Sequence, residues 1–272
     1  MTVDLLSASW AAADGEWPGG QDGVGRAGPD LPDGVEWFEA IYADPEGGEV
    51  RAGLDQLGGA DLERGCPVRS FPSYKGQRNY PGWYWSATMG RRVGFESWVE
   101  RDHLVSLDFD PAVTAMVSQP FWLLWRSPGG KVRRHAPDFF ARVAGGGVLV
   151  LDSRPLDRIG DRDREAFAAA RRACGLLGWR YAVWGAMDPV VAANHRWLAG
   201  YRHPRCGDPE TAARLREVFA HGRPLMAGVR AAGDPIATLP VLFHLMWRGH
   251  LVAGLSEGPL GPATLVRTGE RR

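Results

Sequence analysis

The sequence contains little of what disulfide-rich secreted proteins and membrane proteins are built from. Its 272 residues include three cysteines, which lie far apart and form no Cys-x-x-Cys pair. This spacing argues against a disulfide framework and against structural zinc, and it favours a reducing, cytoplasmic compartment. No run approaches the roughly 18 apolar residues of a membrane helix, and the start, Met1-Thr2-Val3-Asp4, lacks the basic character of a signal peptide. We therefore expect a soluble protein without a membrane partner.

Lysine is also scarce, since Lys75 and Lys131 are the only two and every other basic side chain apart from histidine is an arginine. The net charge of zero hides a division: residues 1–63 contain fourteen acidic and two basic side chains, and the remainder contains eighteen acidic and thirty basic ones. A basic domain with an acidic segment is typical of proteins that bind polyanions, and the segment can compete with the polyanion or dock a protein. A solvated surface with a disordered leader explains the same charges. We hypothesise that the acidic segment weakens DNA binding.

Composition divides the chain into three parts. Residues 1–62 are acidic, rich in Gly and Pro and expected to be largely irregular, with one plausible element near Val35–Tyr42. Residues 63–205 alternate strand and helix patterns and predict a mixed α/β layer. Residues 206–272 predict a small helical, winged-helix-like domain. The expected strands of the middle part are Trp83–Ser86, Val113–Val117, Phe121–Trp125, Val132–Phe140, Val148–Leu151 and Arg180–Trp184. The expected helices are Phe95–Leu104, Arg162–Leu177, Pro189–Leu198, Pro209–Ala220 and Leu239–Arg248, followed by a wing of Leu251–Gly254 and Ala263–Val266.

Two carboxylates lie beside two short apolar runs in the middle part. Asp138 follows His135-Ala136-Pro137, Asp152 ends Val148-Leu149-Val150-Leu151, and Gly145-Gly146-Gly147 lies between them. We expect Asp138 to close one strand and Asp152 the next, so that a hairpin brings both to one edge of a sheet. Carboxylate oxygens at one edge can hold a hard divalent cation, which metal-dependent cleavage of a phosphodiester requires.

Three further residues complete the expected site. Glu96 would arrive from the helix over Phe95–Leu104 as a third carboxylate, and Ser153 would offer its main-chain carbonyl to the metal. Arg154 lies two positions after Asp152, so the period of a strand puts both side chains on one side. Because arginine is not deprotonated in proteins, Arg154 predicts a phosphate clamp or a water-orienting cation and not a general base.

Each of these residues also has an ordinary structural explanation. An Asp at a strand end is often a turn residue, and Asp152 with Arg154 can be a plain ion pair. Glu96 with Glu100 can be a solvated helix face, and His135 by itself is more often structural than a ligand. The three carboxylates together favour a functional site over these explanations, because each lies at the end of a different element that the fold could bring together.

From about Val68 to Arg205 the chain resembles the TnsA-type endonuclease subunit of heteromeric transposases, within the PD-(D/E)xK nuclease superfamily. The superfamily signature alone is weak, whereas an ordered set of motifs over this length is much more specific. The segments that carry the resemblance are Ser73-Tyr74-Lys75-Gly76, Phe95-Glu96-Ser97, Leu107-Asp108-Phe109-Asp110-Pro111, Ser118-Gln119-Pro120-Phe121, His135-Ala136-Pro137-Asp138-Phe139 and Asp152-Ser153-Arg154-Pro155.

The resemblance implies an α/β fold with a restriction-endonuclease-like core, in which a central mixed β-sheet is flanked by helices. It also implies DNA cleavage with Mg²⁺, which Mn²⁺ can replace. The catalytic Glu of the family is matched by Glu96, its strand Asp by Asp138 and its second acidic residue by Asp152. Arg154 stands where the family has Lys, and Lys75 or Lys131 would have to supply any displaced amine. In the family this subunit cuts the 5′ strands beside a DDE-type transposase subunit and an AAA+ regulator, which contacts its C-terminal part.

Basic side chains around the predicted site are expected to contact DNA phosphates. These are Lys75, Arg78, Lys131, Arg133, Arg134, His135 and Arg158. Four nearby aromatic residues could stack on a distorted DNA end, although packing under a loop is the more ordinary explanation. These four are Tyr74, Tyr80, Trp83 and Trp85.

The sequence therefore predicts a Mg²⁺-dependent DNA endonuclease that acts in transposition and DNA recombination, as the 5′-cutting subunit of a TnsA/TnsB-type transposase. Two alternatives stay open. One is a catalytically impaired pseudo-nuclease that binds DNA or a partner without cutting. The other is a stand-alone nuclease of host defence or repair.

Overall fold

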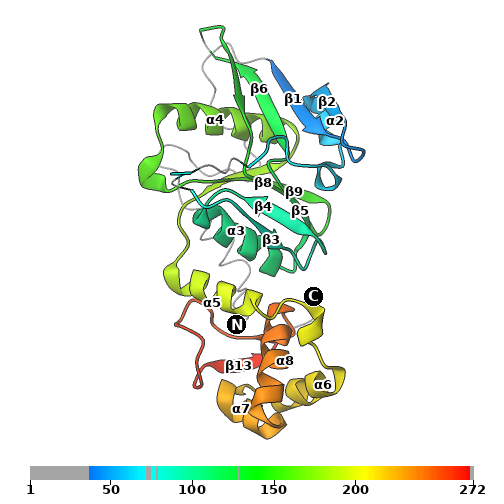
Figure 1. Cartoon of the computed structure of the whole chain (residues 1–272), viewed down its shortest axis with the longest axis vertical. Helices are drawn as coiled ribbons and strands as arrows, with labels where there is room; N and C mark the ends of the chain where they lie inside the picture. Colours follow the sequence, from blue (N-terminus) through cyan, green and yellow to red (C-terminus); the bar gives the residue numbers. More distant parts are fainter. Residues whose placement is uncertain (1–36, 72–74, 78, 128, 270–272) are drawn as a thin grey trace. The chain divides into compact units, whose positions relative to one another are not determined.

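The computed structural model of the chain describes residues 37–71, 75–77, 79–127 and 129–269, which form a mixed α/β protein (Figure 1). These residues belong to two compact units. The first comprises residues 1–104 and 112–186, and the second comprises residues 105–111 and 187–272. The sequence places the division near residue 205 instead. The reason for the difference is Asn194, whose side chain bonds Leu255 O, Gly258 O and Leu260 N and so ties its helix to the C-terminal segment.

The central sheet of the first unit has the strand order β10-β9-β8-β5. Its strands are β5 (Val113–Ser118), β8 (Phe139–Val143), β9 (Gly147–Ser153) and β10 (Arg180–Trp184). β10 runs parallel to β9, and the other pairs are antiparallel, so the sheet is mixed as expected. The run Val148–Leu151 is buried on both faces of β9. A strand of this kind needs cover on both sides of the sheet.

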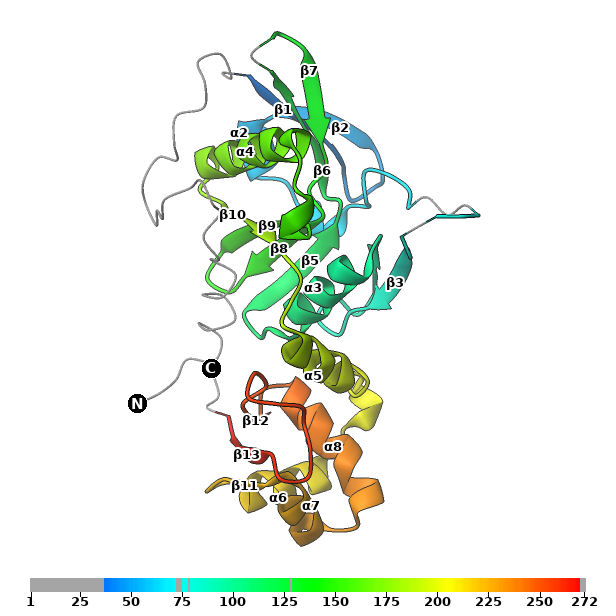
Figure 2. The same cartoon turned by 90° about the vertical axis from the view of Figure 1, so that its left-hand side faces the viewer.

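Helices supply that cover. α4 (Asp161–Leu176) packs its alanine-rich face and Cys174 against Phe140 and Val150. The first half of α3 (Trp98–Phe109) lies on the opposite side, where His103 bonds Ser153 (Figure 2). α3 begins three residues later than the sequence predicts, because β4 (Arg92–Phe95) takes up Phe95.

A second, fully antiparallel sheet has the order β2-β1-β6-β7. Its strands are β1 (Phe38–Ala43), β2 (Glu49–Gly53), β6 (Phe121–Arg126) and β7 (Val132–His135). The single strand predicted over Val132–Phe140 is therefore wrong, since β7 and β8 belong to different sheets and Ala136-Pro137-Asp138 connects them.

The prediction of a largely irregular segment over residues 1–62 is wrong for its described part. β1 and β2 are followed by α2 (Leu54–Gly58) and the 3₁₀ turn η1 (Leu62–Arg64). Ala40, Leu57 and Leu62 join the hydrophobic core with β6 and α4. β1 agrees with the one element expected near Val35–Tyr42, and its ladder with β6 holds it in the second sheet. Residues 1–36 lie outside the described ranges. The hypothesis that the acidic segment weakens DNA binding therefore stays a prediction.

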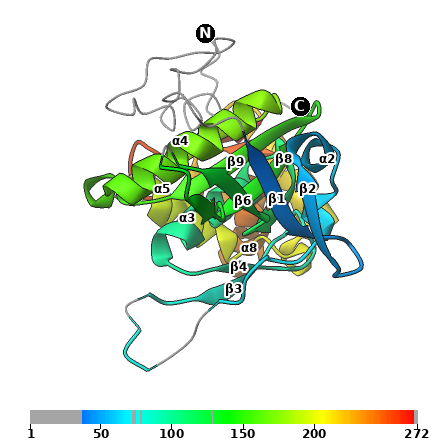
Figure 3. The same ribbon diagram turned by 90° about the horizontal axis from the view of Figure 1, so that it is seen from above.

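β3 (Gly82–Trp85) and β4 form an antiparallel hairpin, seen at the periphery of the first unit in Figure 3. The 3₁₀ turn η2 (Leu156–Arg158) joins β9 to α4.

Besides the end of α3, the second unit contains five helical elements and three short strands in its described part. In chain order they are α5 (Pro189–Ala199), the 3₁₀ turn η3 (Pro204–Cys206), α6 (Pro209–Val218), β11 (Arg223–Pro224), α7 (Leu225–Ala232), α8 (Pro235–Trp247), β12 (Leu251–Val252) and β13 (Leu265–Thr268). The strands form a sheet in the order β11-β13-β12. Across the described ranges, none of the helices combines the length and the apolar character that crossing a membrane requires.

Candidate functional site

The β8–β9 hairpin brings the two central carboxylates together. Phe139 pairs with Leu151, and the turn uses Gly145 and Gly146 at φ 84° and 87°, a conformation that glycine adopts without strain. Asp138 precedes β8, and Asp152 is the penultimate residue of β9. The expectation that Asp138 closes a strand is wrong, because it stands before one. In an antiparallel hairpin the start of the first strand lies beside the end of the second, and this places both carboxylates at one end.

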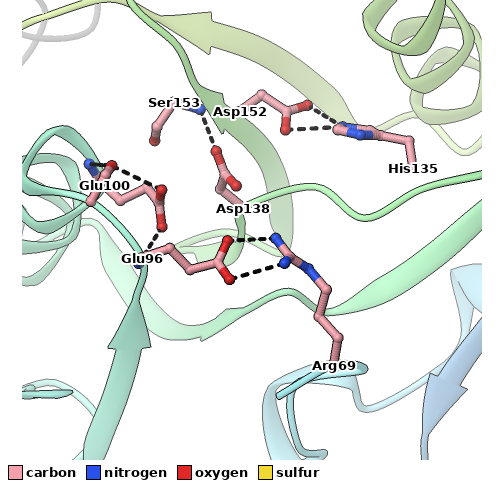
Figure 4. Close-up of polar contacts among 8 residues, drawn as sticks. Arg69, Glu96, Glu100, His135, Asp138, Asp152 and Ser153 are labelled. Atoms are coloured by element: carbon pink, nitrogen blue, oxygen red, sulfur yellow. Dashed lines mark hydrogen bonds and ion pairs between the residues drawn. The ribbon is translucent and has the colours of Figure 1, made fainter. Parts of the chain in front are cut away.

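Asp138 is the most strongly perturbed carboxyl group of the site. Its Oδ2 accepts a hydrogen bond from the main-chain N–H of Ser153 at 2.7 Å (Figure 4). Burial raises the pKa of Asp138 well above its ordinary value, and the neighbouring carboxylates of Glu100 and Asp152 raise it further. A bound cation would stabilise the ionised form of a partly desolvated carboxyl group that lies among other carboxylates.

Asp152 is buried and held by two donors from neighbouring strands. His135 Nε2 lies 3.0 and 2.9 Å from its two carboxylate oxygens, and the Tyr181 hydroxyl donates to its Oδ2 at 2.5 Å. Burial by itself would lower the pKa of His135, but the charge and the hydrogen bonds of Asp152 outweigh it, so the pKa is raised. Burial, followed by the charge of Asp152, raises the pKa of Tyr181 well above its ordinary value. Both shifts favour the protonated forms, in which His135 and Tyr181 donate to the Asp152 carboxylate.

The Glu residues at the start of α3 differ from the sequence prediction. Glu96 does not come from a helix: it lies between β4 and α3, and both its oxygens accept from the guanidinium of Arg69 at 2.9 and 2.6 Å. Glu100 is not on a solvated face, since only 8% of it is exposed. Its oxygens accept from the Glu96 N–H at 2.7 Å and the Ser97 hydroxyl at 2.9 Å, which caps the helix (Figure 4). Burial raises the pKa of Glu100.

Gln119 connects Asp138 to Arg69. Its main-chain N–H donates to the carbonyl of Asp138 at 2.8 Å. Its side-chain amide lies 3.2 Å from the Arg69 carbonyl and 3.1 Å from Arg69 Nη2. The backbone of Gln119 has φ 47°, a strained conformation for a residue other than glycine. Such strain persists only where the surrounding contacts hold it.

Ser153 is fixed from the opposite side of the sheet. Its hydroxyl lies 2.8 Å from His103 Nδ1, and His103 Nε2 lies 2.8 Å from the carbonyl oxygen of Gly185. Burial lowers the pKa of His103 to about 4. The imidazole is therefore neutral at pH 7, donating to Gly185 O and accepting from Ser153.

Arg154 extends toward α4. Its Nη2 lies 3.1 Å from Asp163 Oδ2, and 47% of its side chain is exposed. α4 also contributes Phe167, whose ring packs edge-on against His135 at 5.8 Å between centroids. The ion pair with Asp163 thus holds the Arg154 side chain against α4, and because the pair is exposed it contributes little to stability.

The expected DNA contacts do not form one cluster in the sequence: they lie on the β6–β7 hairpin, on the loop before β3 and on η2. The turn between β6 and β7 carries Lys131, which is exposed, and Arg134 is exposed on β7 with its guanidinium 4.5 Å from the centre of the Trp122 ring. Arg133 is partly buried, with its Nε 3.9 Å from Glu165. Lys75 and Arg158 are exposed on separate loops, His135 is committed to Asp152, and Arg78 lies outside the described residues.

The residues that sequence reasoning missed are Arg69, Glu100, Gln119 and Tyr181. Of these, only Gln119 stands in a segment that the resemblance picked out. Arg69 lies between η1 and β3, outside any helix or strand, and Tyr181 has the sequence context of an ordinary strand residue. Glu100 carried one usable signal, because Ser97 three residues before it forms the spacing of a capping box.

Within the described ranges, no group of three or more His, Cys, Asp and Glu side chains is arranged to hold a metal ion. Mg²⁺ needs fewer protein ligands than that, because one or two carboxylates, waters and substrate phosphates usually complete its shell. Asp138, with its pKa raised by burial and then by two neighbouring carboxylates, offers hard oxygen ligands of this kind.

Neither a scan against models of known protein families nor a search of curated proteins finds a match for this chain.

Proposed function

We propose that this protein is a Mg²⁺-dependent DNA endonuclease with a restriction-endonuclease-like core. The observation that carries the proposal is the partly desolvated carboxyl group of Asp138, held at the end of a β-hairpin next to Asp152 and Glu100. Desolvating a carboxyl group beside two others is unfavourable unless the site has a use for concentrated negative charge. Binding a divalent cation is such a use, and phosphodiester hydrolysis is the chemistry that it serves.

Asp138 and Asp152 would hold the metal, together with Glu100 and the main-chain carbonyl of Ser153. The bound ion would acidify a water and neutralise charge on the phosphate. Glu96 supports this set through Arg69. His135 and Tyr181 orient the Asp152 carboxylate. Arg154 cannot act as a base but can bind a phosphate through two parallel hydrogen bonds once it leaves Asp163.

A basic ribbon supports DNA as the substrate. Arg126 at the end of β6, Lys131 in the turn and Arg134 on the edge strand β7 are exposed, and β7 ends at His135, three residues before Asp138. Exposed basic side chains of this kind contact DNA phosphates. DNA bound along this ribbon would lead toward the carboxylates.

The second unit supports the proposal that the protein is a TnsA-like transposase subunit. Its order of helix, strand, two helices and two strands, from α6 to β13, with β13 between β11 and β12, is the order that we would expect of a winged helix. A TnsA-like subunit that works with a DDE-type transposase and an AAA+ regulator would have this unit beside its nuclease core. The same chemistry would also serve a stand-alone defence or repair nuclease.

Nicking of a supercoiled plasmid tests the proposal. We expect the full chain to nick DNA in Mg²⁺ or Mn²⁺, with partner subunits present, and not in EDTA. Asp138→Asn keeps an oxygen for the Ser153 N–H and removes the charge, so it should abolish nicking and leave DNA binding intact. Asp55→Asn, on exposed α2, is the matched control and should nick normally. Unchanged nicking by Asp138→Asn would refute the assignment.

One observation favours the pseudo-nuclease as a second candidate. Glu96 and Glu100 have both carboxylate oxygens bonded to protein donors, and so has Asp152. Calorimetric titration of Mg²⁺ into the protein with DNA separates the two functions. A metal-dependent nuclease binds Mg²⁺ and loses this binding in Asp138→Asn, whereas a pseudo-nuclease shows DNA binding without a Mg²⁺ signal.

A further inference from the structure

Exposed aromatic side chains gather next to the candidate site. In the described part of the chain, four aromatic side chains are exposed, and three of them belong to the β3–β4 hairpin, its leading loop and the start of α3. Tyr80 is 62% exposed and Trp98 is 48% exposed, and their ring centroids are 5.9 Å apart. We call Tyr80, Trp98 and Arg101 the aromatic platform. The expectation that Tyr80 packs in the core is therefore wrong.

Phe95 and Arg101 hold Trp98 of the platform in place. The ring of Phe95 packs where Gly82 has no side chain, since a Cβ at Gly82 would meet that ring at 2.6 Å. Phe95 then lies 6.5 Å from Trp98, centroid to centroid, at a tilt of 33°. The guanidinium of Arg101 lies 4.1 Å from the centre of the Trp98 ring. Trp98 is thus held by the guanidinium of Arg101 and by the neighbouring buried Phe95, while 48% of it remains exposed.

Trp83 is the third exposed ring, but it belongs to the other face of the hairpin. It pairs with Gly94 across the ladder, and the Phe71 ring fills the space over Gly94 and meets Trp83 edge-on at 5.3 Å. Side chains of adjacent positions alternate between faces, which separates Trp83 from the ring packed over Gly82.

The position of the platform links it to the carboxylates. Trp98 and Arg101 are three residues apart and share one side of the first turns of α3. Glu100 and Glu96 flank them in sequence, with Glu100 turned inward to its own cap. Trp98 and Glu100 belong to the same first turn of α3, so the platform and the buried carboxylates lie at one end of that helix. A nucleotide beside a phosphate bound at Asp138 would reach these rings.

We propose that the aromatic platform stacks an unpaired nucleobase next to the cleaved phosphodiester, so that the preferred substrate is DNA with a splayed or distorted end. This proposal rests on the proposed function, because it takes DNA as the substrate. Nucleobases fit the platform because every base has a π face, and a cation stacked on Trp98 complements the adjoining phosphate. Base pairs in an intact duplex do not expose their faces to such rings.

The test measures DNA binding of the full chain in EDTA by fluorescence anisotropy. The probes are a blunt duplex, the same duplex with one splayed end, and a single strand. We expect Trp98→Ala and Tyr80→Ala each to weaken binding of the splayed and single-stranded probes by about 5- to 100-fold, the effect of losing one stacked base, and to leave the blunt duplex unchanged. Trp98→Phe keeps a π face and should retain most of the affinity. Trp197→Ala is the control, because Trp197 is exposed to a similar extent (54%) in the second unit.

A base analogue supplies a second measurement. 2-Aminopurine in the splayed arm should lose fluorescence on binding to the wild-type chain and to Trp98→Phe, and keep it with Trp98→Ala. Equal affinities of Trp98→Ala and wild type, or equal losses on blunt and splayed probes, would overturn the proposal. So would self-association that depends on Trp98, which would make the platform a contact with a second copy. If the wild-type chain binds no DNA at all, the proposed function fails as well, whereas duplex binding without a role for Trp98 removes the platform alone.

Discussion

Acidification should destabilise the protein through one buried histidine. His103 is 1% exposed, and its two ring nitrogens bond Ser153 and Gly185 in a pattern that a neutral imidazole satisfies. Burial lowers its pKa from 6.5 to about 4. The unfolded chain therefore binds a proton below pH 6.5, and the folded chain does so only near pH 4. The contribution of neutral His103 to the free energy of unfolding is therefore complete above pH 6.5, and it is lost as the pH falls from 6.5 to about 4.

The magnitude follows from the two pKa values. A separation of about 2.5 units corresponds to roughly 3 kcal/mol, at about 1.4 kcal/mol per unit. This is a large share of the ~5–15 kcal/mol that separates folded from unfolded states in typical domains. Because His103 fixes Ser153, whose N–H bonds Asp138, the candidate site should be among the first regions to loosen.

Urea unfolding, followed by circular dichroism between pH 7 and pH 4, provides the assay. The variant His103→Gln keeps a donor and an acceptor but has no proton to gain. Carboxyl groups elsewhere titrate in both proteins, so the difference between their unfolding free energies isolates His103. We expect the advantage of the wild type to shrink by roughly 3 kcal/mol on acidification. A difference that stays constant across this range would refute the reasoning.

Two further predictions concern stability and Arg154. A Cβ added by Gly175→Ala in α4 would meet no atom within 4 Å, so this substitution should stabilise the protein by about 0.5–1 kcal/mol. A Cβ added by Gly228→Ala in α7 would lie 2.1 Å from the buried Phe219 ring, so this substitution should destabilise the protein by about 1–3 kcal/mol. Thermal unfolding measures both, and equal effects of the two substitutions would contradict this account. Arg154→Ala should change the unfolding free energy by less than about 1 kcal/mol, because its pair with Asp163 is exposed, while lowering plasmid nicking. Arg154→Lys should keep nicking, and unaffected nicking by Arg154→Ala would exclude Arg154 from the site.

Three strands of the central sheet, β5, β9 and β10, follow from local patterns in the sequence, whereas β8 does not, because the pattern predicted one strand over Val132–Phe140. The apolar run Val148–Leu151 has the length of a buried strand, and the glycines before it turn the chain, so β9 and its hairpin are predictable. The range of β10 agrees with the prediction at both ends. α4 and α5 also agree with their predicted ranges to within one residue, because each ends beside a glycine and carries a clear apolar face.

The neighbours of the carboxylates were not predictable in the same way. Tyr181 reaches Asp152 because β10 lies parallel to β9, and Arg69 reaches Glu96 across 27 residues. Glu100 looks like a solvated helix residue in the sequence and becomes a buried cap only because α3 starts at Trp98. Such contacts depend on strand pairing and on the start of a helix, which are the features that sequence patterns specify least.

The sequence by itself indicates a hairpin between Asp138 and Asp152, from the glycine turn between two apolar runs, but only the structure places Asp138 before β8 and therefore beside the end of β9. The sequence also determines that the cation after Asp152 is an arginine, which clamps a phosphate and does not take a proton. The tertiary structure alone decides the protonation of the site. Burial of Asp138 beside Glu100, and the donors that His135 and Tyr181 direct at Asp152, arise from three separate segments packed into one low-dielectric place. Electrostatic energies depend on distances and desolvation, and neither quantity exists until the chain has folded.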